Sequence, residues 1–329
     1  MFNLTDIFQV EKLFANSNCR NELFSYLDNC EGVDIYTHAS PDGDAIGSAL
    51  GLYFFIKKRG KQVRVFCQGD IPSKFEFMNT EVFSDNVPLT PFDLCFTLDS
   101  AELSRLGKNF ENFVPSYPVI INIDHHPENP KFGTLNVVDP SAGSTAEIII
   151  ELIYDQPLNA EISNALYVAM LSDTYGFSLP NVSFKTLFWS SFLIANHARS
   201  SYLWHQLFAN DPFNVVQMNS WIISQSKKNN DILLATIPQW IYEHFQTSEE
   251  DTEGLANSLL QIADIDTVIL FRDRGDSVRL SFRSAGKRDV GSIAKSLGGG
   301  GHRLASGANL KASLDQAVNH LLEIITEQE

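Results

Sequence analysis

Short apolar segments alternate with helical patterns in the first half of the chain. Four segments are rich in β-branched, aromatic and aliphatic residues and predict strands: 33–37 (VDIYT), 63–67 (VRVFC), 92–98 (FDLCFTL) and 118–123 (PVIINI). Apolar residues recur at the i, i+3, i+4, i+7 spacing of a helix in three further segments: 45–58, 146–153 and 162–170. Strands that alternate with helices predict an α/β fold with a mostly parallel sheet and flanking helices.

The last hundred residues follow a different pattern. Segments 231–237 and 267–271 predict strands, and 277–283 (SVRLSFR) alternates strictly between apolar and polar residues. Asp289 is placed to cap a helix over the residues that follow it, and a last amphipathic helix is expected from Leu314 to Ile325. No glycine occurs between Phe177 and Glu253, which favours helices there.

The length of 329 residues suggests two domains. We place the first domain at 1–205, a helical connector at 206–228 and a smaller α/β domain at 229–329.

The net charge of −16 argues against a protein that coats long nucleic acid. Residues 272–303 nevertheless hold eight basic and three acidic side chains, a local charge of +5. One basic region in an acidic chain suits a short anionic ligand better than a polymer, so long duplex nucleic acid is not an expected partner.

The spacing of the cysteines and the first residues of the chain indicate the cellular compartment in which the protein is expected. The four cysteines form no CxxC pair, which is typical of reduced thiols in a cytosolic protein. The opening MFNLTDIFQVEK lacks the basic region and apolar stretch of a secretory signal, and the apolar segments are too short to cross a bilayer. We expect a cytoplasmic protein with no membrane partner.

Aspartate and histidine residues follow the ends of the predicted strands and of one helix. The residues concerned are His38, Asp42, Asp44, Asp99, Asp124, His125, His126 and Asp173. Taken alone, any of these aspartates reads as a turn residue or a helix cap, and Asp44 in particular reads as an N-cap. Ligands of open α/β sheets bind at the carboxyl ends of the strands, where this many carboxylates would repel one another without a cation.

Carboxylates combined with imidazoles suit Mn²⁺, Fe²⁺, Co²⁺ or Zn²⁺. Two ions are expected, because one ion cannot use this many ligands. Two metals about 3.5–4 Å apart can share a carboxylate and hold a hydroxide for in-line attack at phosphorus. Gly43 and Gly47 would let the backbone approach closely at this helix start.

A second cluster is the glycine-rich segment Gly298–Gly307 (GGGGHRLASG). A glycine run alone is more often a helix C-cap and a turn. Nearby basic residues and exposed backbone N–H groups favour phosphate binding instead. The candidate residues are Arg279, Arg283, Gly299, Gly300, Gly301, His302 and Arg303.

Five motifs in this order resemble the DHH phosphoesterase family with a C-terminal DHHA1 domain. They are HASPDGDAIGS (38–48), LDSAELSRLG (98–107), IDHHPENPKFG (123–133), SDTYGFS (172–178) and GGGGHRLASGA (298–308). The short two-domain form resembles bifunctional oligoribonucleases that also remove the 3′-phosphate of 3′-phosphoadenosine 5′-phosphate (pAp). The resemblance implies an active site in the cleft between a DHH domain and a DHHA1 domain.

The resemblance also implies roles for single residues. His38, Asp42 and Asp99 would hold one Mn²⁺, and Asp44, Asp99, His125 and Asp173 the other, with Mg²⁺ or Co²⁺ as substitutes. His126 would face the substrate phosphate and Asp124 would orient its neighbours, so that Asp99, Asp124 and His126 form the catalytic set. Arg283, Ser284, His302 and the glycines would hold the substrate. Relatives often read Asp-Thr-Gly after the fourth motif's serine, whereas Tyr175 precedes Gly176 here.

The expected substrates are short oligoribonucleotides and nucleotide bisphosphates such as pAp. The alternative is a soluble phosphodiesterase for cyclic di-AMP or its linear product pApA. A manganese inorganic pyrophosphatase shares the N-terminal motifs but not the glycine-rich one, and a RecJ-type exonuclease needs further domains. A non-catalytic nucleotide sensor would tolerate loss of ligands, yet all six ligand positions are filled. The oligomeric state is open, with a homodimer among the options.

Overall fold

The computed structural model describes residues 17–326. The opening residues used above to look for a secretory signal lie outside that range, as do residues 327–329. The chain divides between Asn210 and Asp211 into two compact units. Within residues 17–326, no helix combines the length and the apolar content that a bilayer crossing requires.

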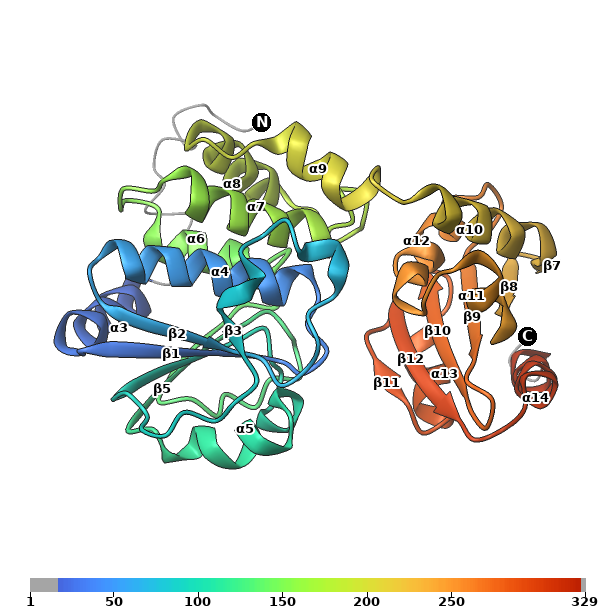
Figure 1. Cartoon of the computed structure of the whole chain (residues 1–329), viewed down its shortest axis with the longest axis horizontal. Coiled ribbons are helices and arrows are strands. Elements are labelled where there is room, and N and C mark those ends of the chain that lie inside the picture. The colour runs from blue at the N-terminus through green and yellow to red at the C-terminus, as the bar shows by residue number, and fades with distance from the viewer. Residues whose placement is uncertain (1–16, 327–329) are drawn as a thin grey trace. The chain divides into compact units, whose positions relative to one another are not determined.

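The first unit is an α/β domain whose helices and strands alternate along the chain (Figure 1). Its α-helices are α3 (Ser17–Asn29), α4 (Gly43–Lys58), α5 (Lys108–Phe113), α6 (Thr145–Ile153), α7 (Ala160–Asp173), α8 (Phe184–Ala195) and α9 (Ser200–Phe208). Its strands are β1 (Gly32–Thr37), β2 (Gln62–Phe66), β3 (Phe83–Ser84), β4 (Leu94–Leu98), β5 (Val119–Asp124) and β6 (Leu135–Val138). Short 3₁₀ turns lie at Ser73–Phe75, Thr80–Val82, Leu103–Leu106 and Val114–Ser116.

The six strands form one sheet in the order β3-β2-β1-β4-β5-β6, and every neighbouring pair is parallel. The expected α/β fold with a mostly parallel sheet is therefore confirmed. Strands β2 and β3 follow β1 towards one edge of the sheet, whereas β5 and β6 follow β4 towards the other edge. The strand order therefore reverses between β1 and β4. In open α/β sheets a ligand site forms at the carboxyl ends of the strands beside such a reversal.

Successive side chains of each strand point to opposite faces of the sheet, and each face has its own hydrophobic core. Val33 and Ile35 of β1 pack with Ile46 and Leu50 of α4 in one buried cluster. Tyr36 points to the other face, into a cluster with Phe110 and other residues around α5. Figure 1 shows α5 on the opposite side of the sheet from α4. Because both faces are covered, the strands are buried and read as nearly continuous apolar runs.

Helices α4 and α7 pack closely because α4 presents glycines to its partner. A Cβ added to Gly47 would lie 2.5 Å from the carbonyl oxygen of Ala165 and 2.8 Å from the Cβ of Ala169. One added to Gly43 would lie 2.3 Å from the hydroxyl of Ser172. The close approach predicted at Gly43 and Gly47 is thus an approach of two helices, and it brings the start of α4 to the end of α7.

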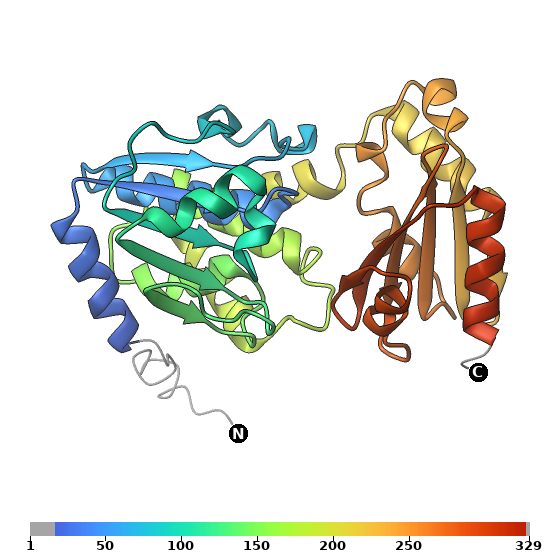
Figure 2. The ribbon, with the colours of Figure 1, turned by 90° about the horizontal axis from the view of Figure 1, so that it is seen from below.

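The second unit contains a mixed sheet between helices (Figure 2). Its helices are α10 (Phe213–Gln225), α11 (Trp240–Phe245), α12 (Leu255–Leu260), α13 (Val290–Ser296) and α14 (Leu314–Thr326), with a 3₁₀ turn at Glu250–Thr252. Its strands are β7 (Lys227–Asn229), β8 (Ile232–Ile237), β9 (Thr267–Asp273), β10 (Val278–Ser284), β11 (Gly300–Gly301) and β12 (Ala305–Leu310), in the order β11-β12-β10-β9-β8-β7.

Each face of this sheet has its own core. Leu280 and Phe282 of β10 pack with α13 and α14, whereas Val268 and Leu270 of β9 pack with α10, α11 and α12. Helix α10 falls in the segment expected to be a connector, and its Met218 and Ile222 are buried in the second of these cores.

Candidate metal centre

Imidazole and carboxylate groups meet at the carboxyl edge of the first sheet, beside the reversal of strand order. His38 follows β1, Asp99 follows β4, and Asp124 ends β5 just before His125 and His126. Asp44 lies in the first turn of α4, and Asp173 is the last residue of α7. The structure therefore brings together the eight residues singled out at the ends of the predicted strands and helix.

One group of ligand atoms comes from His38, Asp42 and Asp99. Nε2 of His38 lies 3.5 Å from Oδ2 of Asp99 and 4.0 Å from Oδ1 of Asp42. Nδ1 of His38 is buried and has no hydrogen-bond partner in the described chain. Asp42 also caps α4, because its side chain accepts hydrogen bonds from the backbone N–H groups of Asp44 and Ala45. The interpretation of Asp44 as the N-cap was therefore wrong. The N-cap is Asp42, two residues earlier, and Asp44 lies in the first turn of the helix.

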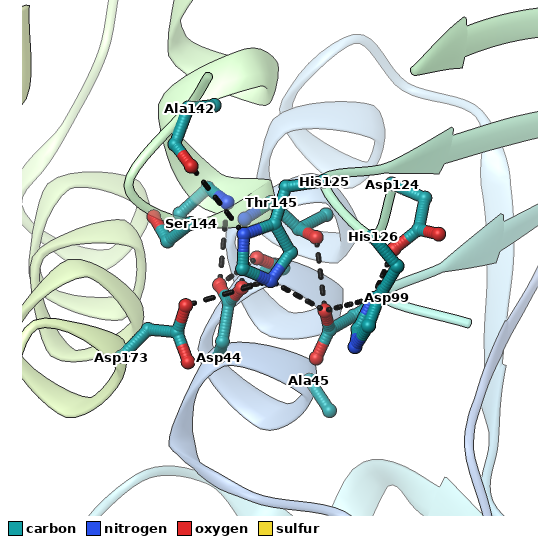
Figure 3. A network of polar contacts seen from close by, with 12 residues as sticks. Asp44, Ala45, Asp99, Asp124, His125, His126, Ala142, Ser144, Thr145 and Asp173 are labelled. Atoms are coloured by element: carbon teal, nitrogen blue, oxygen red, sulfur yellow. Dashed lines mark hydrogen bonds and ion pairs between the residues drawn. The ribbon is translucent and has the colours of Figure 1, made fainter. Parts of the chain in front are cut away.

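A second group comes from Asp44, His125 and Asp173, which Figure 3 shows gathered around the imidazole of His125. Nε2 of His125 lies 3.4 Å from Oδ2 of Asp173 and 3.9 Å from Oδ2 of Asp44. Nδ1 of the same ring faces the carbonyl oxygen of Ala142 at 3.4 Å. That contact directs Nε2 towards the carboxylates.

Asp99 connects the two groups: it belongs to the first, and with His125 and His126 it forms a third group of possible ligands. Its Oδ2 faces His38, and its Oδ1 lies 3.5 Å from Nε2 of His125. The backbone of Asp99 is left-handed, with φ at 54°, a conformation that is uncommon outside glycine and asparagine. One carboxylate with an oxygen directed to each group is the arrangement that a bridging ligand needs.

His126 is held by the last residue of β5. Its Nδ1 lies 2.7 Å from Oδ1 of Asp124, while Oδ2 of Asp124 accepts a hydrogen bond from Nδ2 of Asn129 at 2.7 Å. Asp124 is fully buried, and its position fits the orienting role that the resemblance implied. Asn129 was missed, because an asparagine in a loop rich in proline and glycine reads as a turn residue.

The carboxylates of the centre disfavour one another's charged forms. Burial, followed by the charges of Asp99 and Asp173, raises the pKa of Asp44 well above its ordinary value. Burial and the charges of Asp42 and Asp99 likewise raise the pKa of Asp173. Burial alone would lower the pKa of His38, but its contact with Asp99 and the charge of Asp42 raise it overall. A cation would relieve this repulsion, so nitrogen and oxygen donors in this arrangement fit a divalent transition metal.

The start of α6 completes the surroundings of the two carboxylates. The backbone N–H of Thr145 donates to Oδ2 of Asp44 at 2.7 Å, and its hydroxyl donates to Oδ1 of Asp99 at 3.1 Å. Ser48 donates to Oδ1 of Asp44 at 2.9 Å. Sequence reasoning missed Thr145 because serine and threonine at helix starts ordinarily serve as caps.

The basic residues predicted to hold phosphate lie on β10 and differ in their contacts. Arg279 forms an ion pair with Glu249 at 3.1 Å, and half of its side chain is exposed. Arg283 donates to the side-chain oxygen of Asn257 and to the carbonyl oxygen of Phe282. Within residues 17–326 no carboxylate lies within 4 Å of Arg283, whose pKa is lowered by burial and by the charge of Arg279.

The glycine run of the second unit, Gly298–Gly301, has two structural functions. Gly298 follows α13 with φ at 74°, as in a helix C-cap, and Gly300 and Gly301 pair with β12 as strand β11. Arg303 is exposed and donates to the carbonyl oxygen of Gly286. Ser284 is buried, where its hydroxyl donates to Asp266 at 3.3 Å and accepts hydrogen bonds from two backbone N–H groups of the turn that follows. The run is thus a cap and a strand rather than an open loop, and Gly299, Gly300, Gly301 and His302 lie along the edge of the sheet.

Comparison with known proteins covers both units. The family described as DHH family, N-terminal domain, matches residues 33–171, and the DHHA1 domain matches residues 229–328. A bifunctional oligoribonuclease and PAP phosphatase from Thermus thermophilus is 35% identical over 304 residues, which are 90% of each chain. The cyclic-di-AMP phosphodiesterase GdpP of Bacillus subtilis is 27% identical over 90% of this chain but only 47% of its own length.

Among solved structures, an exopolyphosphatase-related protein from Bacteroides fragilis is similar over 94% of this chain and 96% of its own. The TM-score is 0.89 at 24% sequence identity. This likeness supports the fold of both units.

Proposed function

Because the chain belongs to the DHH family and carries a DHHA1 domain, we propose that it is a metal-dependent phosphoesterase that hydrolyses short oligoribonucleotides and removes the 3′-phosphate of pAp. The relative from Thermus thermophilus is named for those two activities, which supports this choice of substrates. A cytoplasmic location fits the free cysteines of the described chain.

The observation that carries the proposal is the division of Asp99 between two groups of ligands. We propose that His38, Asp42 and Asp99 hold one Mn²⁺ and that Asp44, Asp99, His125 and Asp173 hold the other. Mg²⁺ or Co²⁺ would be substitutes, and Mn²⁺ is preferred because the donors mix imidazole with carboxylate. Two bound ions would supply Lewis-acid activation of the phosphoryl group and an activated water for in-line attack.

The residues of the chain itself would then orient the substrate and stabilise the charge on its phosphate groups. His126 would contact the substrate phosphate, with Asp124 fixing its ring by accepting a hydrogen bond from Nδ1. Arg283 would bind a further phosphate, since its charge has no carboxylate partner in the described chain. Arg279 is the weaker candidate, because Glu249 already accepts its hydrogen bond. Ser284 would shape the turn that follows β10, and His302, Arg303 and the glycines would complete the basic region.

A phosphodiesterase for cyclic di-AMP or pApA is the alternative, and the partial likeness to GdpP does not favour it. The deciding experiment incubates purified protein and Mn²⁺ with pAp, pApA, cyclic di-AMP and short RNA and compares kcat/KM. We expect pAp and two- to five-residue RNA to lead. No hydrolysis of any of the four would refute the proposal, and a preference for cyclic di-AMP would favour the alternative.

A further inference from the structure

We propose that Thr145 is a positioning residue of the metal centre, which fixes the rotation of the Asp99 carboxylate so that each oxygen faces its own group of ligands. This inference rests on the proposed function, because it assigns a purpose to one residue beside the same centre. Thr145 is fully buried as the first residue of α6, a place where the sequence suggested only an ordinary helix start.

The hydroxyl of Thr145 contacts one particular oxygen of Asp99. Oγ1 donates to Oδ1 at 3.1 Å, and the same Oδ1 lies 3.5 Å from Nε2 of His125 (Figure 3). The other oxygen, Oδ2, faces His38. A carboxylate turns easily about its last bond, so a donor bound to Oδ1 removes a freedom that would otherwise be lost on metal binding.

The hydroxyl is not needed to begin the helix. Ser144 is the N-cap of α6, and its side chain accepts the backbone N–H of Glu147. The backbone N–H of Thr145 donates to Oδ2 of Asp44 at 2.7 Å, and that of Ala146 donates to Oδ1 of Asp44 at 3.3 Å. The start of α6 therefore holds Asp44 through main-chain donors and Asp99 through the side chain of Thr145, so a change of this side chain tests Asp99 alone.

The start of α6 is itself held in place. Oε2 of Glu147 accepts hydrogen bonds from the backbone N–H of Gly143 at 3.1 Å and from the hydroxyl of Thr186 at 2.8 Å. Nδ2 of Asn181 donates both to the carbonyl oxygen of Gly143 and to that of Asp173. These contacts keep Thr145 from moving away from Asp99, and rigid support of this kind tunes a metal site.

Three variants separate positioning from folding. Thr145→Val removes the hydroxyl at nearly constant shape, and Thr145→Ser keeps it. Thr267→Val is the matched control, because it removes another buried hydroxyl that donates to a carboxylate, in this case that of Asp266 in the second unit at 2.9 Å. Each protein is titrated with MnCl₂ by calorimetry without substrate, and its melting temperature is measured without metal.

We expect Thr145→Val to bind Mn²⁺ about 10- to 100-fold more weakly than wild type, the range found when support of a ligand is lost. Thr145→Ser should stay within about threefold, and Thr267→Val should melt earlier with Mn²⁺ affinity nearly unchanged. Equal affinities of Thr145→Val and wild type would overturn the inference, as would an equal loss in Thr267→Val. If Thr145→Val does not fold, Thr145→Ala is titrated instead and the same outcomes apply. Wild-type protein that binds no Mn²⁺ would refute the proposed function itself.

Discussion

His38 and Asp99 face each other at the ends of two neighbouring parallel strands, with Nε2 of His38 3.5 Å from Oδ2 of Asp99. Strand β1 delivers the imidazole and β4 the carboxylate, so the register of the sheet sets their separation. Because the other oxygen of Asp99 faces His125, this aspartate is the residue whose loss should affect both groups of ligands at once.

Asp99→Ala should lower the hydrolysis of pAp by on the order of a thousandfold and reduce bound Mn²⁺, while the circular dichroism spectrum stays that of a folded protein. The matched control is Asp85→Ala, which removes an exposed carboxylate whose only side-chain partner within residues 17–326 is Asn86. Near-native activity of Asp99→Ala in Mn²⁺ would exclude a bridging role.

Removal of metal should lower thermal stability as well as activity. A ligand that binds only the folded state stabilises it by about 2.7 kcal/mol when present at a hundred times its dissociation constant. Adding Mn²⁺ to chelator-treated wild-type protein should therefore raise the melting temperature by several degrees, and the shift should be much smaller for Asp99→Ala. The two proteins are compared by scanning calorimetry, and equal shifts would place the stabilising ion elsewhere.

Arg283→Ala should leave metal content unchanged and lower kcat/KM for pAp by roughly 30- to 150-fold, as expected for a lost charged contact of about 2–3 kcal/mol. Slow hydrolysis of a small generic phosphodiester, bis-p-nitrophenyl phosphate, should change little. Arg279→Ala is the comparison, and its loss should be smaller because Glu249 already pairs with that arginine. If Arg283→Ala harms both substrates equally, the residue supports the structure and does not bind substrate.

Glu249 should contribute to stability in a pH-dependent way. Partial burial would raise the pKa of Glu249, but its hydrogen bond and ion pair with Arg274 and the charge of Arg279 lower it overall. A carboxyl group whose pKa is lowered in the folded state stabilises the fold above its unfolded pKa, and this contribution fades as the pH falls through the folded value. Glu249→Gln should thus cost up to about 1 kcal/mol at pH 7. In urea unfolding, the gap from wild type should close below about pH 4, and a constant gap would contradict the ionic origin.

Gly47→Ala should destabilise the first unit by about 1–3 kcal/mol, because the new Cβ would meet backbone atoms of α7 that cannot move aside. It should also weaken Mn²⁺ binding, since it would separate Asp44 from Asp173. Gly51→Ala is the control. Its Cβ would meet side-chain atoms of the buried Leu166 but no backbone atom, and alanine favours a helix by about 1 kcal/mol over glycine. A variant Gly47→Ala as stable as Gly51→Ala would show that α4 and α7 can move apart freely.

The sequence predicted the central strands and the residues that gather at their ends, because both leave local signals. Strands β1, β2, β4 and β5 are apolar runs, and the residues after them stand out as polar. Strands β3 and β11 have two residues each, and β7 is wholly exposed Lys227–Asn229, so none has a periodic pattern to detect. Strand β12, with alanine and glycine among its residues, reads as a loop.

The supporting residues of the centre could not be predicted in the same way. Asn129, Thr145 and Asn181 are ordinary loop or cap residues in sequence. Thr145 and Asn181 acquire their roles from partners far along the chain, and Asn129 acquires its role from the fold of the loop that returns it to Asp124. Asp42 is a different case, because one of its two roles was predicted and the other was not. Its carboxylate was expected near His38, but that it also begins α4 depends on backbone angles that the sequence does not reveal.

The left-handed backbone of Asp99 has a consequence for how this protein can evolve. A side chain at φ 54° carries a backbone cost that glycine lacks, and the charge of Asp99 raises the pKa values of Asp44 and Asp173. Glycine at this position would remove the backbone cost and that repulsion, together with the contacts to His38 and His125 and the shared carboxylate. A library of variants selected only for heat resistance is therefore expected to lose this aspartate early. Thermal stability does not require the shared carboxylate at this position, whereas catalytic turnover does.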